Sequence, residues 1–259
     1  MRLSRFFLLV FFFSSSLLAN NPKISIITSL YKGETFIEGF MQDIVQQTIF
    51  DQCELIIINA NSPENEEPFI RPYLEKYPNI FYFELEKDPG LYAVWNIAIE
   101  LARGEFITNA NVDDRLSHVC YETYLKNLEE HPKIDLVYSN PVHTHTPNET
   151  FENNTAVKVF NRAEFAPNSM KDCLPGPNPM WRKKLHEKHG MFDESFKHSG
   201  DWEMWCRAVA GGARFLKVPG TFCLYFYNPQ GLSTSRKIAF KAAWEDGRIR
   251  RTYGFLWKD

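Results

Sequence analysis

Short β-branched runs alternate with segments of helical period along the first half of the chain, and this alternation constrains the fold more than any other feature. The expected strands cover residues 24–29, 55–58, 80–83 and 105–108. Between them apolar residues recur at helical spacing, over residues 36–45, 69–74 and 91–103. Strands that alternate with helices indicate right-handed βαβ units and a parallel sheet. The sequence therefore predicts an α/β fold whose mostly parallel central sheet is flanked by helices.

The second half of the chain is less regular. Residues 140–180 are rich in Asn, Thr and Pro, and a loop of that length usually has a function, such as a lid or a substrate-binding segment. Helices are expected over residues 121–128, 182–188 and 201–210, and strands over residues 134–138, 214–218 and 222–226. With 259 residues, of which 44% are hydrophobic, the chain can bury a sizeable core. We predict a single domain over residues 21–235.

Residues 1–20 have the pattern of an export signal or a short membrane anchor. Arg2 and Arg5 precede a run of Phe and Leu, and cleavage is expected after Ala19. The run is shorter than the roughly 20 residues of a comfortable membrane span. We therefore expect an exported or membrane-associated protein, with the cytosolic face as the open alternative.

Residues 236–259 predict a basic amphipathic C-terminal helix. Phe240, Ala243 and Trp244 share one face of this helix. Two settings remain open for it. Such a helix can lie on anionic lipid headgroups, or it can dock on the domain and leave its charges in water.

The charge and the cysteines exclude several classes of protein. The formal net charge is −3, and a globally acidic chain is a poor nucleic-acid binder, so no nucleic-acid partner is expected. The five cysteines are scattered, and their number is odd. This argues against a complete disulfide framework and favours buried free thiols. No Cys/His spacing typical of a zinc site is found.

Residues 88–115 combine a turn, a helix, a strand and an acidic tip. Residues 88–90 (Asp-Pro-Gly) have turn chemistry, and Gly104 stands where a glycine would end the helix. Residues 111–114 (Asn-Val-Asp-Asp) follow the expected strand, at the edge where open α/β sheets bind ligands. Adjacent carboxylates need solvent, a cationic partner or a metal ion. Mg²⁺ or Mn²⁺ suits such oxygens, and a solvated acidic turn is the alternative.

Four stretches, in this order, resemble the family-two glycosyltransferases of GT-A fold over nearly all of residues 22–235. PKISIITSLYK is similar to that family's first strand and nucleotide-binding loop, and ELIIINANSPENEE to its second strand and base-binding turn. GLYAVWNIAIELARGEFITNANVDDR resembles its helix, strand and DxD-type metal motif. GMFDESFKHSGDWEMWCRAVAGG resembles its acceptor-side loop and catalytic-base helix.

The resemblance implies an inverting transferase that uses a nucleotide-diphosphate sugar and Mn²⁺ or Mg²⁺ in surface glycan or polysaccharide synthesis. It places the general base at Asp201 and the metal ligands at Asp113 and Asp114. Donor contacts are implied at Thr28, Asn59, Asn61, Asp88, Asn96 and Asn111. The implied partners are a nucleotide sugar, with UDP-sugars favoured, a glycan or lipid-linked acceptor, and a membrane surface.

Three positions depart from the family's pattern. Asn59 and Asn111 stand where the family commonly carries aspartate, and Trp95 stands where many relatives carry arginine beside the diphosphate. An asparagine side chain both accepts and donates hydrogen bonds, so contacts with a nucleotide are retained while two negative charges are lost. These departures keep a second hypothesis open, that of a non-catalytic nucleotide-sugar- or sugar-binding module on the same fold.

Overall fold

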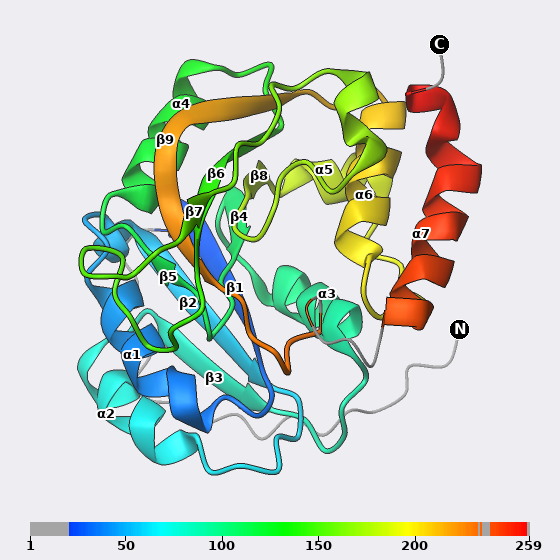
Figure 1. The fold of residues 1–259 in the computed structure, drawn as a ribbon. Coiled ribbons are helices and arrows are strands. Elements are labelled where there is room, and N and C mark those ends of the chain that lie inside the picture. The colour runs from blue at the N-terminus through cyan, green and yellow to red at the C-terminus, as the bar shows by residue number, and fades with distance from the viewer. Residues whose placement is uncertain (1–20, 233, 235–238, 258–259) are drawn as a thin grey trace.

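The computed structural model describes residues 21–232, 234 and 239–257. Within them the chain forms an α/β unit with a nine-stranded sheet and helices on both of its faces (Figure 1). The strand order is β3-β2-β1-β4-β8-β6-β9-β5. The ninth strand, β7, is outside this order and pairs with β6. The predicted α/β class, with a mostly parallel central sheet, is confirmed. The predicted signal or anchor segment, residues 1–20, lies outside the described residues.

The first four strands form the parallel half of the sheet. They are β1 (Ile24–Leu30), β2 (Cys53–Asn59), β3 (Ile80–Glu84) and β4 (Phe106–Asn109). β1 pairs with β2 on one side and with β4 on the other, and β2 also pairs with β3. Ile26 packs into the core on one face of the sheet, and its neighbour Ile27 packs into the core on the other. Burial on both faces explains why these strands read as continuous apolar runs.

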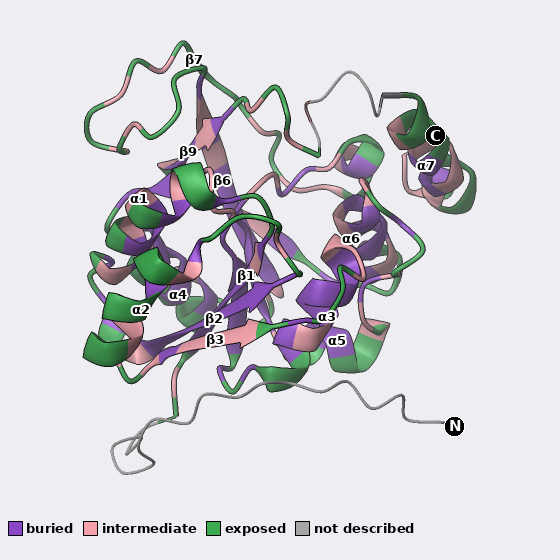
Figure 2. Cartoon of the chain, turned by 90° about the horizontal axis from the view of Figure 1, so that it is seen from below, coloured by how far each residue is buried: buried purple, intermediate pink, exposed green. Residues whose placement is uncertain are grey.

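Seven helices surround the sheet within the described residues. They are α1 (Glu34–Val45), α2 (Glu67–Lys76), α3 (Leu91–Leu101), α4 (Cys120–Glu130), α5 (Lys184–His189), α6 (Gly200–Ala210) and α7 (Ala239–Tyr253). α1 and α4 pack into one core, whereas α3, α5 and α6 pack into the other. The buried residues accordingly gather in the sheet and on the helix faces turned toward it (Figure 2). None of the helices in this part of the chain is long and apolar enough to cross a membrane.

The second half of the sheet differs from the sequence prediction in three places. Its strands are β5 (Arg115–Leu116), β6 (Leu136–Thr144), β7 (Lys158–Val159), β8 (Met180–Arg182) and β9 (Phe215–Phe226). β6 and β7 extend into the segment 140–180 that we predicted to be irregular. The two strands predicted over 214–218 and 222–226 form the single strand β9, because its pairing with β6 continues past Gly220. Arg182, predicted to begin a helix, belongs to β8, and α5 starts at Lys184.

Gly104 has a different role from the predicted helix cap. α3 ends at Leu101, Ala102 is already extended, and the φ of Gly104 is not positive. Its amide donates to Ser25 Oγ at 2.8 Å, and a Cβ at this position would lie 2.7 Å from the Ser25 backbone nitrogen. Glycine is needed here because the chain entering β4 crosses directly against β1.

We predict that Gly104→Ala lowers the free energy of unfolding by about 1–3 kcal/mol, since the added methyl group meets backbone atoms that cannot rotate away. Urea denaturation of the purified protein measures this change. Gly247→Ala in α7 is the matched control, because its Cβ would meet only the flexible end of Arg251 at 3.3 Å. Equal stability of the two variants would contradict the proposed contact.

Candidate functional site

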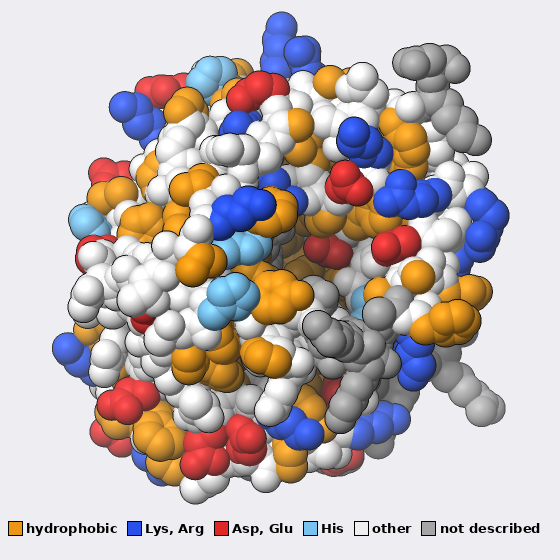
Figure 3. All heavy atoms as spheres, viewed as in Figure 1, with side chains coloured by type: hydrophobic (Ala, Val, Ile, Leu, Met, Phe, Trp, Pro, Cys, Tyr) orange, Lys and Arg blue, Asp and Glu red, His pale blue; other side chains and the backbone are white. Residues whose placement is uncertain are grey.

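The candidate site lies at the carboxyl edge of the parallel strands. β1, β2 and β4 end at Leu30, Asn59 and Asn109, and adjacent parallel strands bring the loops that follow them together. Ligands of open α/β sheets bind at this edge. The molecular surface is hollowed between the β6–β9 side of the sheet and α6 (Figure 3), with acidic side chains in the hollow and histidine and basic side chains on its rim.

The loops after β1 and β2 are joined by a network that the sequence analysis missed. The Ser62 hydroxyl accepts a hydrogen bond from the Lys32 amide at 2.9 Å and donates one to Glu66 Oε1 at 2.6 Å. The same carboxylate oxygen accepts from the Gly33 amide at 2.9 Å. Glu66 is 1% exposed. These hydrogen bonds hold the two loops in one arrangement, and a single Glu in an acidic stretch of the sequence does not indicate such a role.

Three of the predicted donor-binding residues belong to this part of the edge. Asn59 uses its side chain to shape the turn, because its Oδ1 accepts from the Ser62 amide at 2.7 Å and its Nδ2 donates to the Tyr82 hydroxyl at 2.8 Å. Asn61 is exposed in the same turn, with a φ of 56°. Thr28 is the third of these residues. Its side chain is 0% exposed inside β1 and does not reach the surface of the edge, so a donor contact at Thr28 stays a prediction.

The remaining donor-binding predictions fall on α3 and the turn before it. Asp88 is exposed, and its Oδ1 accepts from the Gly90 amide at 2.7 Å, which fixes the turn. Asn96 is buried and does not face solvent. Its side chain accepts from the Phe192 amide at 3.0 Å and donates to the Phe192 carbonyl at 2.9 Å. This double contact ties α3 to the loop before α6, so the structure gives Asn96 a positioning role in place of the predicted donor contact.

The acidic tip after β4 contains one open carboxylate. Asp114 is 3% exposed, and its two oxygens accept from the Phe226 amide at 3.1 Å and from Asn111 Nδ2 at 2.9 Å. Burial, and then the neighbouring Asp113, raise the pKa of Asp114 well above its usual range. Asp113 is half-buried; its Oδ2 accepts from Asn228 Nδ2 at 3.0 Å, and its Oδ1 has no hydrogen-bond partner among the described residues.

The oxygens at this tip fit a hard divalent cation that also takes ligands from a substrate. Within the described residues, Asp113 Oδ1 and Asn111 Oδ1 have no hydrogen-bond partner, and such oxygens suit Mg²⁺ and Mn²⁺. Over the described residues, no group of three or more His, Cys, Asp or Glu side chains is arranged to hold a metal ion by itself. The metal-ligand assignments of Asp113 and Asp114 therefore stay predictions.

Asp201, the predicted general base, lies half-buried in the first turn of α6. The Tyr92 hydroxyl of α3 is 3.2 Å from its Oδ1, and the Cys173 thiol donates to its Oδ2 at 3.4 Å. Burial raises the pKa of Asp201, and these two side chains and the Trp202 amide partly offset the rise. A carboxylate with a raised pKa is a stronger base than one in water. Neither Tyr92 nor Cys173 was among the predicted site residues.

A short segment connects Asp201 with the acidic tip. It begins at Cys173, and its far end is held to the last residue of β4, because Asn109 Nδ2 donates to the Pro177 carbonyl at 2.7 Å. Four peptide units separate Cys173 from Pro177, so their Cα atoms lie at most about 14 Å apart. The general-base candidate and the edge that carries Asp113 therefore belong to one region of the molecule.

The C-terminal helix fixes the loop that leads into α6. Glu245 of α7 is 4% exposed, and its carboxylate accepts from the backbone amides of Lys197, His198 and Ser199 at 2.8–2.9 Å. α7 thus docks on the domain, which is one of the two settings left open by the sequence. The face predicted from Phe240 and Trp244 is not the docking face, since these side chains are 87% and 59% exposed.

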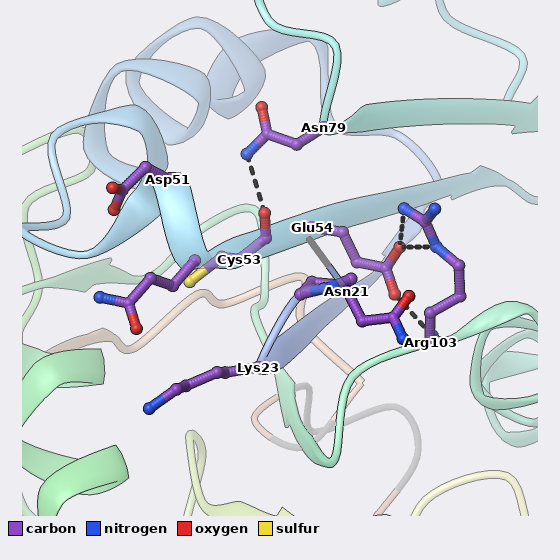
Figure 4. A pocket seen from close by; sticks show the side chains of 9 residues that line it. Asn21, Lys23, Asp51, Cys53, Glu54, Asn79 and Arg103 are labelled. Carbon is purple, nitrogen blue, oxygen red and sulfur yellow. Dashed lines mark hydrogen bonds and ion pairs between the residues drawn. The ribbon is translucent and has the colours of Figure 1, made fainter. Parts of the chain in front are cut away.

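The pocket in Figure 4 lies at the opposite edge of the sheet. It has a volume of about 500 Å³ and is lined by residues that precede or begin the parallel strands β1 to β4, among them Lys23, Cys53 and Asn79. Its central feature is the ion pair of the buried Glu54 with Arg103, at 2.7 Å. Proteins of this architecture bind ligands at the carboxyl ends of the strands. We therefore give this pocket a structural role and do not include it in the candidate site.

Comparison with known proteins agrees with the architecture. The family model described as Glycosyl transferase family 2 matches residues 25–190, which is more than half of the chain. The fold and the candidate site together define the class of this protein, an α/β domain with polar loops at the carboxyl edge of its sheet. The chain belongs to glycosyl transferase family 2.

Individual relatives cover different parts of the chain. GgaB of Bacillus subtilis, a minor teichoic acid biosynthesis protein, is 30% identical over 119 residues, which are 45% of this chain and 13% of that protein. The uncharacterized glycosyltransferase MJ1057 of Methanocaldococcus jannaschii is 24% identical over 76% of this chain and 68% of its own length. The chain thus spans only a small part of the former relative.

Solved structures share the fold at low identity. S. aureus TarS 1–349 in complex with UDP-GlcNAc has a TM-score of 0.71 and 17% identity, and covers 88% of this chain and 65% of that one. The mannosyltransferase PcManGT from Pyrobaculum calidifontis, in complex with GDP-Man and Mn²⁺, has a TM-score of 0.60 and 15% identity, with coverages of 83% and 59%. These likenesses show the fold of the chain.

We predict that Glu245→Ala loosens the loop before Asp201, because three backbone amides lose a charged acceptor. Hydrogen exchange at Lys197, His198 and Ser199 should become faster, and the unfolding free energy should fall by about 2–4 kcal/mol. Glu129→Ala is the control, since Glu129 makes only an exposed ion pair with Lys23. Unchanged hydrogen exchange at the three amides in Glu245→Ala would show that the Glu245 carboxylate does not hold this loop.

Proposed function

We propose that this protein transfers a sugar from a nucleotide-diphosphate sugar to an acceptor hydroxyl, with inversion at the anomeric carbon, in the synthesis of a surface glycan. The observation that carries this proposal is the setting of Asp201. Its carboxylate is half-buried, is held by Tyr92 and Cys173, has a raised pKa, and is linked by a short segment to the edge that bears Asp113.

In the proposed reaction Asp201 accepts the proton of the acceptor hydroxyl. The acceptor oxygen forms a bond to the anomeric carbon, and the bond from that carbon to the diphosphate oxygen breaks. The nucleoside diphosphate leaves with the electron pair. A single displacement needs one base and no protein nucleophile, so the sugar inverts its configuration.

Asp113 and Asn111 would hold a divalent cation at the leaving-group side. Bound there, Mn²⁺ or Mg²⁺ would neutralise charge that develops on the diphosphate. The chain's own contribution is to orient the donor: Asn61 and Asp88 are exposed on neighbouring loops of the carboxyl edge, and Asn59 holds the turn that carries Asn61. Neighbours of the same fold support this donor class, since TarS was solved with UDP-GlcNAc and PcManGT with GDP-Man and Mn²⁺.

A non-catalytic binding module is the competing function. It would bind nucleotide sugar at the same edge without releasing nucleoside diphosphate. The two functions differ in turnover, so calorimetry with nucleotide sugars, run beside an assay of nucleoside diphosphate release, separates them. Heat of binding with no release for the wild-type protein would overturn the proposed transfer.

Asp201→Asn is expected to lower the transfer rate by about 10²–10⁴-fold, because it removes the proton acceptor. Donor affinity, measured by calorimetry with Mn²⁺, should stay unchanged. Asp113→Asn should instead weaken donor binding in the presence of Mn²⁺. Asp51→Asn, at the opposite edge of the sheet, is the control for both. Substantial turnover by purified Asp201→Asn would defeat the base assignment.

Tyr92→Phe is expected to move the acid limb of the rate–pH profile to higher pH. The hydrogen bond from Tyr92 lowers the pKa of Asp201, so its loss raises a pKa that burial has already raised. The base is then protonated, and activity lost, at a higher pH than in the wild type. Tyr124→Phe is the control, because that buried hydroxyl donates to Ser139 at 2.7 Å. An acid limb that stays in place, or moves to lower pH, would contradict the hydrogen bond between Tyr92 and Asp201.

A further inference from the structure

A group of cationic and aromatic side chains lies on β6, β7 and the residues that follow them. We call it the basic strip and define it as His143, His145, Lys158, Phe160 and Arg162. The pairing of β7 with β6 builds it, because Lys158 lies opposite His143 in the register and the Phe160 amide donates to the Pro141 carbonyl at 2.8 Å. None of these side chains has a role in the proposed transfer chemistry.

The Phe160 ring of the strip is stacked with His143 and lies close to two cations. His143 stacks on Phe160 with ring centroids 4.6 Å apart and an interplanar angle of 14°. Lys158 Nζ and Arg162 Cζ lie 5.0 Å and 5.5 Å from the centroid of the same Phe160 ring. Phe160 is still 40% exposed. The exposed part of this ring offers apolar surface to the C–H groups of a sugar or polyol, next to the two cations that lie over the ring.

The basic strip carries positive charge that no ion pair within the described part of the chain neutralises. Neither Lys158 nor Arg162 forms an ion pair among the described residues, and the nearby Glu164 pairs with Lys217 at 3.4 Å. The charges act on His143, whose pKa is lowered by burial and then by Arg162, Lys158 and His145. In a chain with a net charge of −3, unpaired cations gathered around one ring indicate an anionic ligand.

Both ends of the strip reach the candidate site. At one end Arg162 donates to the Cys173 carbonyl at 3.0 Å, and the Cys173 thiol contacts Asp201. The Nε of Arg162 is buried and has no hydrogen-bond partner. At the other end the His145 ring contacts Tyr227, with centroids 5.4 Å apart, and the next residue, Asn228, donates to Asp113.

We infer that the basic strip binds the acceptor, and that the acceptor is a phosphate-bearing glycan or polyol chain. The inference rests on the proposed function, since it assigns the substrate class of that site. Phosphates of the chain lie against Lys158 and Arg162, and a sugar or polyol unit lies on Phe160. A hydroxyl further along the chain then reaches Asp201, because Arg162 and Asp201 both contact Cys173. The donor diphosphate is held separately at the acidic tip.

Fluorescence anisotropy of the full-length protein with a labelled poly(glycerol phosphate) oligomer tests this, beside an uncharged glucan oligomer of equal length. The phosphate chain should bind more tightly than the glucan, with an affinity that falls as salt is raised. Lys158→Glu should weaken binding of the phosphate chain by about tenfold. Lys126→Glu, the same charge change at an exposed position of α4, should weaken it far less.

Phe160→Ser is the second variant, and it should weaken binding of the phosphate chain without changing its salt dependence. Equal losses in Lys158→Glu and Lys126→Glu, or glucan binding as tight as that of the phosphate chain, would overturn the inference.

Donor binding, measured separately with nucleotide sugars, should be the same in the wild type and all three variants. Transfer to a neutral acceptor alone overturns the acceptor class and leaves the proposed function standing. Binding of the phosphate chain without any turnover of nucleotide sugar would support the basic strip as a binding site for this chain and would overturn the proposed function.

Discussion

The parallel pairing of β1 with both β2 and β4 is the constraint on which the rest of the structure depends. Hydrogen bonds on both sides of β1 leave no freedom in the relative direction of these strands, so the loops that follow them emerge at one edge. A buried ionic contact reinforces this arrangement at the opposite edge. Glu54 of β2 accepts from Ser25 of β1 at 2.6 Å and from the amide of Arg103, just before β4, at 2.6 Å. One carboxylate thereby joins three adjacent segments of the sheet.

The second half of the site is held by a different device. α6 carries Asp201, and its entrance loop is held by the carboxylate of Glu245, so the C-terminal helix contributes to the site without lining it. α7 also supplies Tyr253, whose hydroxyl donates to Glu203 of α6 at 2.8 Å. Three backbone amides satisfied by one buried carboxylate hold a loop more firmly than exposed ion pairs do. The position of Asp201 is therefore determined by contacts that are remote in the sequence.

The sequence predicted the parts of this fold that depend on local pattern. Buried parallel strands are apolar runs, and the helices between them have a helical period, so β1 to β4 were identified within a few residues. Pairing between distant segments was not predictable. Pro219-Gly220 reads as a break, yet β9 continues through it because β6 supplies hydrogen bonds on its side. Trp95, which stands where many relatives carry arginine beside the diphosphate, is 6% exposed and packs edge-on against Phe192 in the core.

The same distinction between local sequence pattern and distant contacts applies to the candidate site. Asp113 and Asp201 were predicted because each stands in a stretch that resembles a family motif, and their roles stay predictions. Thr28 and Asn96 stood in such stretches too, but the structure buries both, since tertiary packing decides which side of an element faces solvent. Tyr92 and Cys173 contact Asp201 from positions 109 and 28 residues away, and such contacts leave no mark in the sequence. A motif shows which residues occur at a site, whereas their partners follow from the fold.

The charge at the acidic tip has a consequence for how a donor would bind under the proposed function. Asn111 is neutral, and both oxygens of the buried Asp114 already accept hydrogen bonds, so Asp113 is the one open carboxylate of the tip among the described residues. The guanidinium of Arg115, buried behind the tip, further offsets this charge. The affinity of a hard cation for a site rises with the number of charged ligands. Under the proposed function, a tip with one open carboxylate would bind a divalent cation weakly until a diphosphate supplied further oxygens, and the donor would then provide most of the ligands of the metal ion.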